Sequence, residues 1–361
     1  MARGTGEARR LLRELRPAAI LGTGGYVCVP LFLAARAQGV PTAIYLPDVV
    51  PGLAVQWLAK IATVVTCNVE DSAKYFGLQA DVRLEGSRNL QSKLVVTGYP
   101  VRAELFTQDK AACRAAFGLA GALPTLLVYG GSRGARSINQ AIAALLPHLL
   151  PLAQIIHVCG REGDEQFLQD AATQLPMELR ERYKLYPYLF SGDQRPGIRG
   201  QGPGVRDQGL EARHQEPGLP LEGEPDSPAL QRRELVRREP KTMTAAFGAA
   251  DLAICRSGAS TLAELPAAGL PAVLIPYPFV HQEENADYLV ARGAALKLQD
   301  GAMLGTGRPE HGPLFGEVRR LLLAHDERFR MSERSRSLAR PDAAHRLAEV
   351  LLALATSTRN E

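Results

Sequence analysis

The sequence predicts an α/β protein built on two parallel β-sheets. Its 361 residues exceed one usual domain and are enough for two α/β domains that each bury a core. Short apolar segments alternate with helical segments along most of the chain, which is typical of parallel sheets whose strands are joined by helices. Two of the apolar segments run into glycine-rich loops followed by helices, at residues 22–25 and 130–134. The repeat of this pattern indicates two units of similar construction.

Composition excludes several other classes of protein. The net charge of +4 and the pI near 8.8 are too mildly basic to indicate nucleic-acid binding, but they are compatible with anionic substrates or an anionic membrane surface. The five cysteines have neither the spacing of a metal site nor that of a disulfide framework, which indicates a reducing compartment. No apolar run reaches the length of a membrane span, and residues 1–10 lack the apolar segment of a signal peptide. We therefore expect a cytosolic or peripheral protein.

The first half of the chain begins with a predicted helix at residues 7–15, which has leucines along one side and arginines around it. Such a helix usually docks on the protein surface, and a basic helix facing a membrane is the alternative. Strands are predicted at residues 17–21, 42–46, 62–67 and 93–97, with helices at 52–61 and 111–117. We place a domain boundary after Gly118, so that residues 1–118 form the first domain.

The second half repeats the pattern. Strands are predicted at residues 125–129, 153–159, 184–189, 251–255 and 272–275, with helices at 137–150, 243–250, 260–268, 317–325 and 341–354. Residues 119–340 form the second domain, and residues 341–361 form a C-terminal helix. Each glycine loop could bring backbone N–H groups close to a phosphate, although such loops often serve only to make a tight strand-to-helix turn.

Residues 191–240 interrupt the second domain. They contain eight glycines and seven prolines among 50 residues, together with many charged and few aromatic side chains. Such a segment cannot bury enough apolar surface to offset its chain entropy. We predict that it is a disordered insert.

The segment 253–269 is the most informative single stretch. A short buried strand ends at Cys255, a tight turn covers residues 256–258, and a helix follows. The N–H groups at the start of that helix could hold a phosphate, and Glu264, one turn further on, could accept two hydrogen bonds from ribose hydroxyls. The alternative is a capping box, in which Thr261 and Glu264 stabilise the helix start.

Four motifs in one order resemble the MurG family. They are residues 22–26 (GTGGY), 98–102 (GYPVR), 130–139 (GGSRGARSIN) and 256–264 (RSGASTLAE), and His281-Gln282 and residues 340–344 (RPDAA) lie beyond them. The family transfers N-acetylglucosamine from its UDP-sugar to the lipid-linked muramyl-pentapeptide of peptidoglycan synthesis. The resemblance implies a GT-B fold, in which two Rossmann-like domains face each other across a cleft. It implies a peripheral protein on the cytoplasmic face of the cell membrane, and neither a metal ion nor a cofactor.

The resemblance also implies roles for particular residues. Arg102 and Ser132 engage the nucleotide, Glu264 the ribose and Gln282 the sugar hydroxyls of UDP-N-acetylglucosamine, while the backbone at Leu189 meets the uracil. The implied donor site comprises Arg102, Ser132, Leu189, Ala259, Ser260, Thr261, Leu262, Ala263, Glu264 and Gln282. The implied site for the acceptor's pyrophosphate comprises Gly22, Thr23, Gly24, Gly25 and Tyr26. Members of the family usually carry Asn where this chain has Asp48.

One family motif has no counterpart here. The family opens with a glycine loop ending in a histidine, a proposed catalytic base, and nothing before Arg16 matches that loop. We therefore expect an incomplete N-terminal domain and a very low rate of sugar transfer, because loss of a positioned base typically costs about 100- to 10,000-fold in rate. His157 and His281 are the nearest replacements by type. We expect His157 to lie in the core and His281 to neighbour the donor site.

Three functions remain open on the sequence. The first is sugar transfer of the MurG type. The second is another GT-B enzyme that moves a sugar from UDP to a lipid, such as a diacylglycerol glycosyltransferase; the motifs at residues 130–139 and 256–264 favour the first. The third is a remnant that binds UDP-sugar without catalysis.

Overall fold

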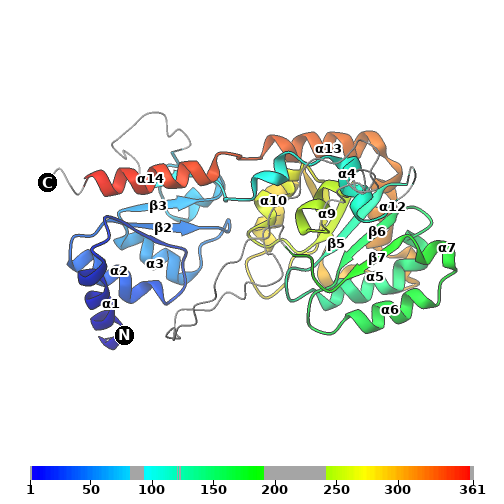
Figure 1. Ribbon diagram of the computed structural model, residues 1–361, viewed down its shortest axis with the longest axis horizontal. Helices are drawn as coiled ribbons and strands as arrows, with labels where there is room; N and C mark the ends of the chain where they lie inside the picture. The colour runs from blue at the N-terminus through cyan, green and yellow to red at the C-terminus, as the bar shows by residue number, and fades with distance from the viewer. Residues whose placement is uncertain (1, 82–92, 120, 122, 191–240, 358–361) are drawn as a thin grey trace, which may run out of the picture.

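The chain folds around two separate parallel sheets (Figure 1). The computed structural model describes residues 2–81, 93–119, 121, 123–190 and 241–357, so the predicted insert lies outside the described residues. Within these residues, no helix is both long and apolar enough to cross a membrane. Nor does any group of three or more His, Cys, Asp or Glu side chains in the described part form a metal-binding cluster.

The first sheet has four parallel strands in the order β1-β2-β3-β4. Its strands and the segments that connect them are α1 (Ala2–Leu15), β1 (Ile20–Gly22), α2 (Cys28–Ala37), β2 (Thr42–Leu46), α3 (Leu53–Ile61), β3 (Val64–Cys67), the 3₁₀ helix η1 (Glu70–Tyr75) and β4 (Leu94–Val96). Alternate strand residues face opposite sides. Ile44 and Leu46 pack with α2 and α3, whereas Ala43 belongs to a separate cluster on the other face.

That other face is covered by the last helix of the chain. α14 (Ala343–Ser357) inserts Val350 and Leu354 against Ala43, Val64 and Val95. Figure 1 shows α14 lying along the first sheet after the chain has passed through the second. A parallel sheet is stable when both of its faces are covered, and here the C-terminal segment completes the cover.

The second sheet has six parallel strands in the order β10-β9-β8-β5-β6-β7. Its first half comprises the 3₁₀ helix η2 (Ala103–Phe106), α4 (Lys110–Ala116), β5 (Thr125–Tyr129), α5 (Arg136–Leu149), β6 (Gln154–Val158), α6 (Glu165–Thr173), α7 (Met177–Arg180) and β7 (Tyr183–Tyr186). Its second half comprises α9 (Met243–Ala249), β8 (Leu252–Cys255), α10 (Thr261–Ala268), β9 (Ala272–Leu274), α11 (Glu283–Ala291), β10 (Ala295–Lys297), two short 3₁₀ turns, α12 (Pro313–Leu323) and α13 (His325–Ser337).

The chain changes direction across the second sheet between β5 and β8. After β5 it adds β6 and β7 on one side, and it then returns to add β8, β9 and β10 on the other. The loops that follow β5 and β8 therefore diverge and leave a crevice at the carboxyl ends of these two strands, the place where doubly wound sheets bind ligands.

Several predicted boundaries were wrong. The strand expected at 17–21 is β1 (Ile20–Gly22), and the strand expected at 184–189 ends as β7 at Tyr186. The helix expected at 317–325 is α12, which begins earlier at Pro313, and α13 follows it after one residue, Ala324. The helices α6, α7 and α13 and the strand β10 were not predicted. The short elements α7 and β10 carry too few residues for an apolar period to appear, and α13 is rich in charged residues and buries only Met331 and Ser335 among its described side chains.

Candidate functional site: a crevice at the carboxyl ends of β5 and β8

A pocket of about 720 Å³ opens where the loops after β5 and β8 diverge. This volume lies within the range of small-molecule sites in proteins. Its walls come from the glycine loop and the start of α5, from the turn before α10, and from the loop before α11. The lining residues are Tyr129, Gly130, Gly131, Ser132, Arg133, Gly134, Ala135, Arg136, Ser137, Glu162, Arg256, Gly258, Ser260, Thr261, Tyr277, Pro278, Phe279, Gln282 and Asp300.

Four of the predicted donor residues line this pocket: Ser132, Ser260, Thr261 and Gln282. Ser132 is exposed in the loop after β5, so its hydroxyl is accessible to a ligand. Gln282 is held by its side-chain oxygen, which accepts a hydrogen bond from the backbone N–H of Tyr277 at 2.9 Å. Its amide NH₂ group is therefore the end that can donate to a ligand.

Arg256 forms the floor of the pocket. Its guanidinium is ion-paired with Asp300 and donates to the Ser137 hydroxyl at 2.8 Å, and the Ser137 hydroxyl donates to the same carboxylate at 2.7 Å. The ring of Tyr277 lies 5.3 Å from the guanidinium carbon. This network ties the turn after β8 to the start of α5. Asp300 could not be predicted from the sequence, because it lies 44 residues after Arg256 in a segment without a motif.

Glu264 lies beside the pocket on α10, and the structure does not form the proposed capping box. Thr261 donates its hydroxyl to the Arg256 carbonyl, and the backbone N–H of Glu264 bonds to the Ser260 carbonyl at 2.8 Å. Burial raises the pKa of Glu264, whereas a hydrogen bond with the Ser260 side chain and the positive charge of Arg102 lower it. The structure thus brings Arg102 and Glu264 together from segments far apart in the chain.

The remaining predicted donor residues are less exposed to the pocket. Leu189 is only 5% exposed and its side chain belongs to the core, so only its backbone can meet a ligand. Leu262 is likewise buried, and it lines a separate small hollow with Ala263 and Tyr99. Ala259 lies in the turn just before α10.

The predicted acceptor loop, residues 22–26, follows β1 at the carboxyl edge of the first sheet. Tyr26 is 74% exposed and the adjacent Val27 is 87% exposed. The loop lies against the start of α3, because a Cβ atom added to Gly24 would be 3.0 Å from a methyl group of Val55. Leu53 and Trp57 of α3 have exposed side chains, and they therefore lie on the same side of the sheet as the loop.

Asp48 and Asn285 connect the two sheets at the site. The Asn285 side chain accepts from the backbone N–H of Val49 at 2.9 Å, and it donates to the Asp48 carboxylate at 2.8 Å and to the Ser257 carbonyl at 3.0 Å. Burial raises the pKa of Asp48, while Asn285 and the charge of His281 lower it. The sequence offered only a weak signal here, the polar run from His281 to Asn285.

The two histidines considered as replacements for the missing base lie in different environments. His157 is fully buried in β6, where its ring nitrogens bond to the Tyr183 hydroxyl and the Asn139 side chain, so it belongs to the core as expected. His281 is exposed beside Gln282. Of these two, only His281 can reach a substrate.

Comparison with known proteins identifies the family. Glycosyltransferase family 28 C-terminal domains match residues 125–191 and 240–347, and the N-terminal domain of that family matches residues 1–67. The chain is 57% identical to UDP-N-acetylglucosamine-N-acetylmuramyl-(pentapeptide) pyrophosphoryl-undecaprenol N-acetylglucosamine transferase of Roseiflexus sp. (strain RS-1). The match covers 97% of this chain and 72% of the length of the relative. The chain belongs to the MurG family. The enzyme of the same name from Desulforamulus reducens is 31% identical over 94% of this chain and 75% of its own length.

Solved structures agree on the fold. MurG of Acinetobacter baumannii is similar with a TM-score of 0.61 and 23% sequence identity. The match covers 96% of this chain and 77% of the Acinetobacter chain. UDP-GlcNAc 2-epimerase of Neisseria meningitidis bound to UDP-GlcNAc is similar with a TM-score of 0.57 and 14% sequence identity. The match covers 97% of this chain and 80% of the epimerase chain. The predicted α/β class with two Rossmann-like units is confirmed. The family match omits residues 192–239, which fall within the predicted insert.

Proposed function

We propose that this chain transfers N-acetylglucosamine from UDP-N-acetylglucosamine to the undecaprenyl-pyrophosphoryl-N-acetylmuramyl-pentapeptide acceptor, the reaction that converts lipid I to lipid II. The observation that carries the proposal is the pocket between the loops after β5 and β8, which gathers Ser132, Gln282 and the start of α10 around one volume. Membership of the MurG family supports the choice of donor and acceptor.

The geometry supports a specific placement of the donor. The diphosphate lies between the glycine loop that carries Ser132 and the N-terminal turn of α10, because unpaired backbone N–H groups at a helix start favour anions. Glu264 then accepts from the ribose hydroxyls, with Arg102 next to it, and Gln282 donates to the sugar. The uracil meets the backbone at Leu189. Such fixed donors stabilise the negative charge that develops on the departing UDP.

We assign the acceptor to the first domain. Residues 1–118 form the acceptor side, residues 119–340 the UDP-sugar side, and the helix within 341–361 packs back on the first sheet. The loop from Gly22 to Tyr26 holds the acceptor's pyrophosphate. Exposed Tyr26, Val27 and Leu53 next to this loop favour contact with the anionic cytoplasmic face of the membrane, where aromatic and aliphatic side chains insert at the interface.

The proposal is tested by titrating the chain with UDP-N-acetylglucosamine and by following radiolabelled sugar onto lipid acceptors. Ser132→Ala removes a hydrogen bond to a charged group and should weaken donor affinity by about tenfold or more. The matched control is Ser337→Ala, which replaces an exposed serine that lies far along the chain from the residues of the pocket. Unchanged affinity in Ser132→Ala contradicts the donor placement. Transfer to diacylglycerol instead of the muramyl lipid, or binding without transfer to any lipid, would favour the two alternative functions.

Membrane contact is tested by vesicle sedimentation. Val27→Asp places a charge on an exposed apolar side chain and should reduce binding to vesicles that contain anionic lipid, while leaving UDP affinity unchanged. Leu323→Asp, which alters an exposed leucine at the end of α12, is the control. Equal vesicle binding by the unmodified chain, Val27→Asp and Leu323→Asp contradicts the assignment of the exposed side chains beside residues 22–26 to membrane contact.

A further inference from the structure

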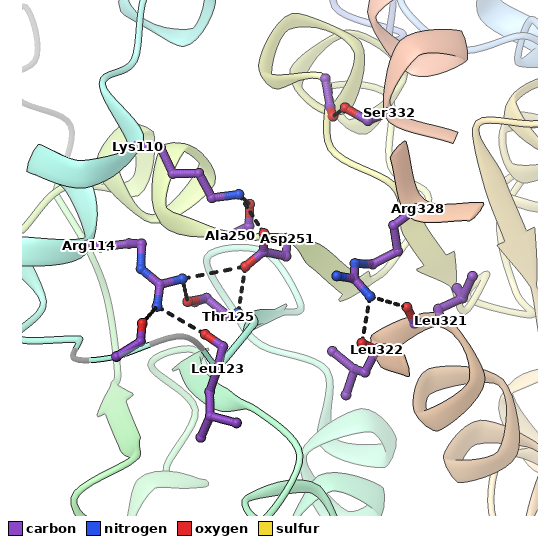
Figure 2. Close-up of polar contacts among 12 residues, drawn as sticks. Lys110, Arg114, Leu123, Thr125, Ala250, Asp251, Leu321, Leu322, Arg328 and Ser332 are labelled. Atoms are coloured by element: carbon purple, nitrogen blue, oxygen red, sulfur yellow. Dashed lines mark hydrogen bonds and ion pairs between the residues drawn. The ribbon is translucent and has the colours of Figure 1, made fainter. Parts of the chain in front are cut away.

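A second cavity, of about 240 Å³, lies at the opposite end of the six-stranded sheet. Asp251 directly precedes β8 and Thr125 begins β5, so the cavity is at the amino ends of these strands, whereas the donor pocket is at their carboxyl ends. Figure 2 shows Lys110 and Asp251 on one side and Arg328 and Ser332 on the other. The lining residues are Leu105, Phe106, Gln108, Lys110, Phe247, Gly248, Ala250, Asp251, Ala267, Ala268, Gly269, Leu270, Pro271, His325, Arg328, Phe329, Ser332 and Arg336. The two pockets share none of their lining residues.

The charge of the walls is positive. Asp251 is the one carboxylate among the lining residues, against three permanent cations, Lys110, Arg328 and Arg336. Its two oxygens are already engaged: one pairs with Lys110 at 2.5 Å, and the other accepts from the Thr125 N–H at 2.7 Å and lies 3.6 Å from a guanidinium nitrogen of Arg114. The Asp251 carboxylate is therefore neutralised from within the protein, and the two arginines determine the charge that a ligand meets.

Arg328 and Arg336 differ in how they are held. Arg328 donates to the carbonyls of Leu321 and Leu322 at the end of α12, and in the described part of the chain no carboxylate pairs with it. Arg336 lies against Gly269, where an added Cβ would be 2.6 Å from a guanidinium nitrogen. Gly269 has φ of +60°, the left-handed conformation that glycine adopts at a helix end, and its missing side chain leaves room for that guanidinium. Among the described residues, the carboxylate that pairs with Arg336 is that of exposed Glu333, at 3.8 Å.

Size and wall chemistry limit the class of ligand. A volume of about 240 Å³ is below the range of roughly 300 to 1,000 Å³ that holds drug-sized molecules, which favours a ligand smaller than a nucleotide sugar. Phe106, Phe247 and Leu270 supply apolar walls beside the cations. Guanidinium groups bind phosphate oxygens through paired N–H donors. We propose that this cavity is a second anion site, which binds a phosphate dianion carried on a short carbon skeleton or free in solution.

The experiment uses the whole chain, saturated with UDP so that the donor pocket is filled. Inorganic phosphate is titrated calorimetrically at constant ionic strength maintained with chloride. We expect saturable binding that Arg336→Gln weakens about tenfold or more, since a hydrogen bond to a charged group is lost. Arg336→Lys should weaken binding less than Arg336→Gln does, because the charge remains while the paired N–H donors are lost. Arg330→Gln, which removes an exposed arginine of the same helix outside the cavity, should bind as the unmodified chain does.

Each other result contradicts the proposal. If UDP abolishes the phosphate signal, phosphate was binding in the donor pocket. If Arg336→Gln and Arg330→Gln bind phosphate equally, the cavity is not the site. The side chain of Arg336 is 61% exposed, so its replacement should leave the melting temperature nearly unchanged, and Arg336→Glu should abolish binding in a protein that still melts cooperatively. Glycerol phosphate titrated in parallel distinguishes the two sources: tighter binding than inorganic phosphate indicates a ligand with a carbon skeleton.

Discussion

The two glycine loops occupy equivalent positions after the first strand of each sheet, yet one glycine of positive φ in each, Gly134 and Gly25, is packed very differently. In the second loop, a Cβ added to Gly134 would be 2.1 Å from the Cys159 carbonyl oxygen, and a Cβ added to Gly160, which follows β6, would be 2.2 Å from the Gly134 nitrogen. In the first loop, a Cβ added to Gly25 would meet nothing within 4 Å. Both glycines have positive φ, +93° and +78°, so the difference is one of packing and not of backbone conformation.

A buried polar network holds the second loop in place. Asn139 donates to the Cys159 carbonyl and to Asp164, both at 2.8 Å, and its side-chain oxygen bonds to His157 at 2.9 Å. The first loop has a single side-chain contact of this kind, from the Cys28 thiol to the Gly24 carbonyl, among the described residues. Such packing is consistent with the diphosphate site proposed for the second loop, because preorganised donors stabilise developing negative charge without rearrangement.

The largest effect should come from replacing the packed glycine. Gly134→Ala forces a methyl group into a carbonyl oxygen at positive φ and should lower the free energy of unfolding by at least about 3 kcal/mol. Gly25→Ala imposes only the unfavourable φ and should cost about 1 to 2 kcal/mol. Urea denaturation of both variants measures the difference. Equal losses would show that the two loops are constrained alike.

The second prediction concerns ligand binding beside the packed loop. Glu264→Ala removes two expected ribose hydrogen bonds, each worth roughly 1.5 to 3 kcal/mol, and should weaken UDP binding at least about 100-fold while the melting temperature changes little. Calorimetric titration with UDP gives the affinity. Glu317→Ala, which replaces a half-buried carboxylate on α12 outside the pocket, is the control. Unchanged affinity in Glu264→Ala would leave Glu264 with a structural role only.

The third prediction tests the network that supports the packed loop. Burial lowers the pKa of His157 from 6.5 to about 3, so the unfolded chain binds a proton at pH values where the folded chain does not. Stability from this group is complete above pH 6.5 and is lost as pH falls toward 3, by about 1.4 kcal/mol per pH unit. Urea denaturation at pH 7, 6 and 5 should show a steeper loss in the unmodified chain than in His157→Gln. His345→Gln, an exposed histidine, should retain the steep loss, and parallel slopes in all three would contradict the prediction.

The smallest effect is expected where the two sheets meet. Burial raises the pKa of Asp48, so its contribution to stability is complete below the unfolded pKa near 3.8 and is lost as pH rises through the raised value. Asp48→Asn removes the buried charge and keeps an oxygen that can accept from Asn285. We expect a slightly higher melting temperature at pH 7 and no difference below about pH 4. A lower melting temperature at pH 7 would show that the charge is net stabilising.

Much of the fold follows from local sequence. The strands Thr42–Leu46 and Thr125–Tyr129 were predicted with their observed bounds, because each is a buried apolar run enclosed by proline or glycine. The glycine loop with Ser132 and the turn before α10 were found for the same reason, since their residue types are demanded by backbone geometry. Those motifs, read jointly, also indicated the family. Asp300 and Tyr277 were not assigned to the site because single polar or aromatic residues in loops carry no periodic signal.

The sequence by itself determined most of the strands and the position of the glycine loops, because these depend on the period of apolar residues and on local backbone preference. The residues expected to hold a nucleotide sugar followed instead from the resemblance of the motifs to a known family. Only the tertiary structure decided which distant segments meet. It placed α14 on the first sheet, joined Val49 to Asn285 across 236 residues, and set Arg336 near Lys110 around a second cavity. Such contacts arise when separately formed elements bury their remaining apolar faces, and that choice depends on the shapes of surfaces that local sequence does not encode.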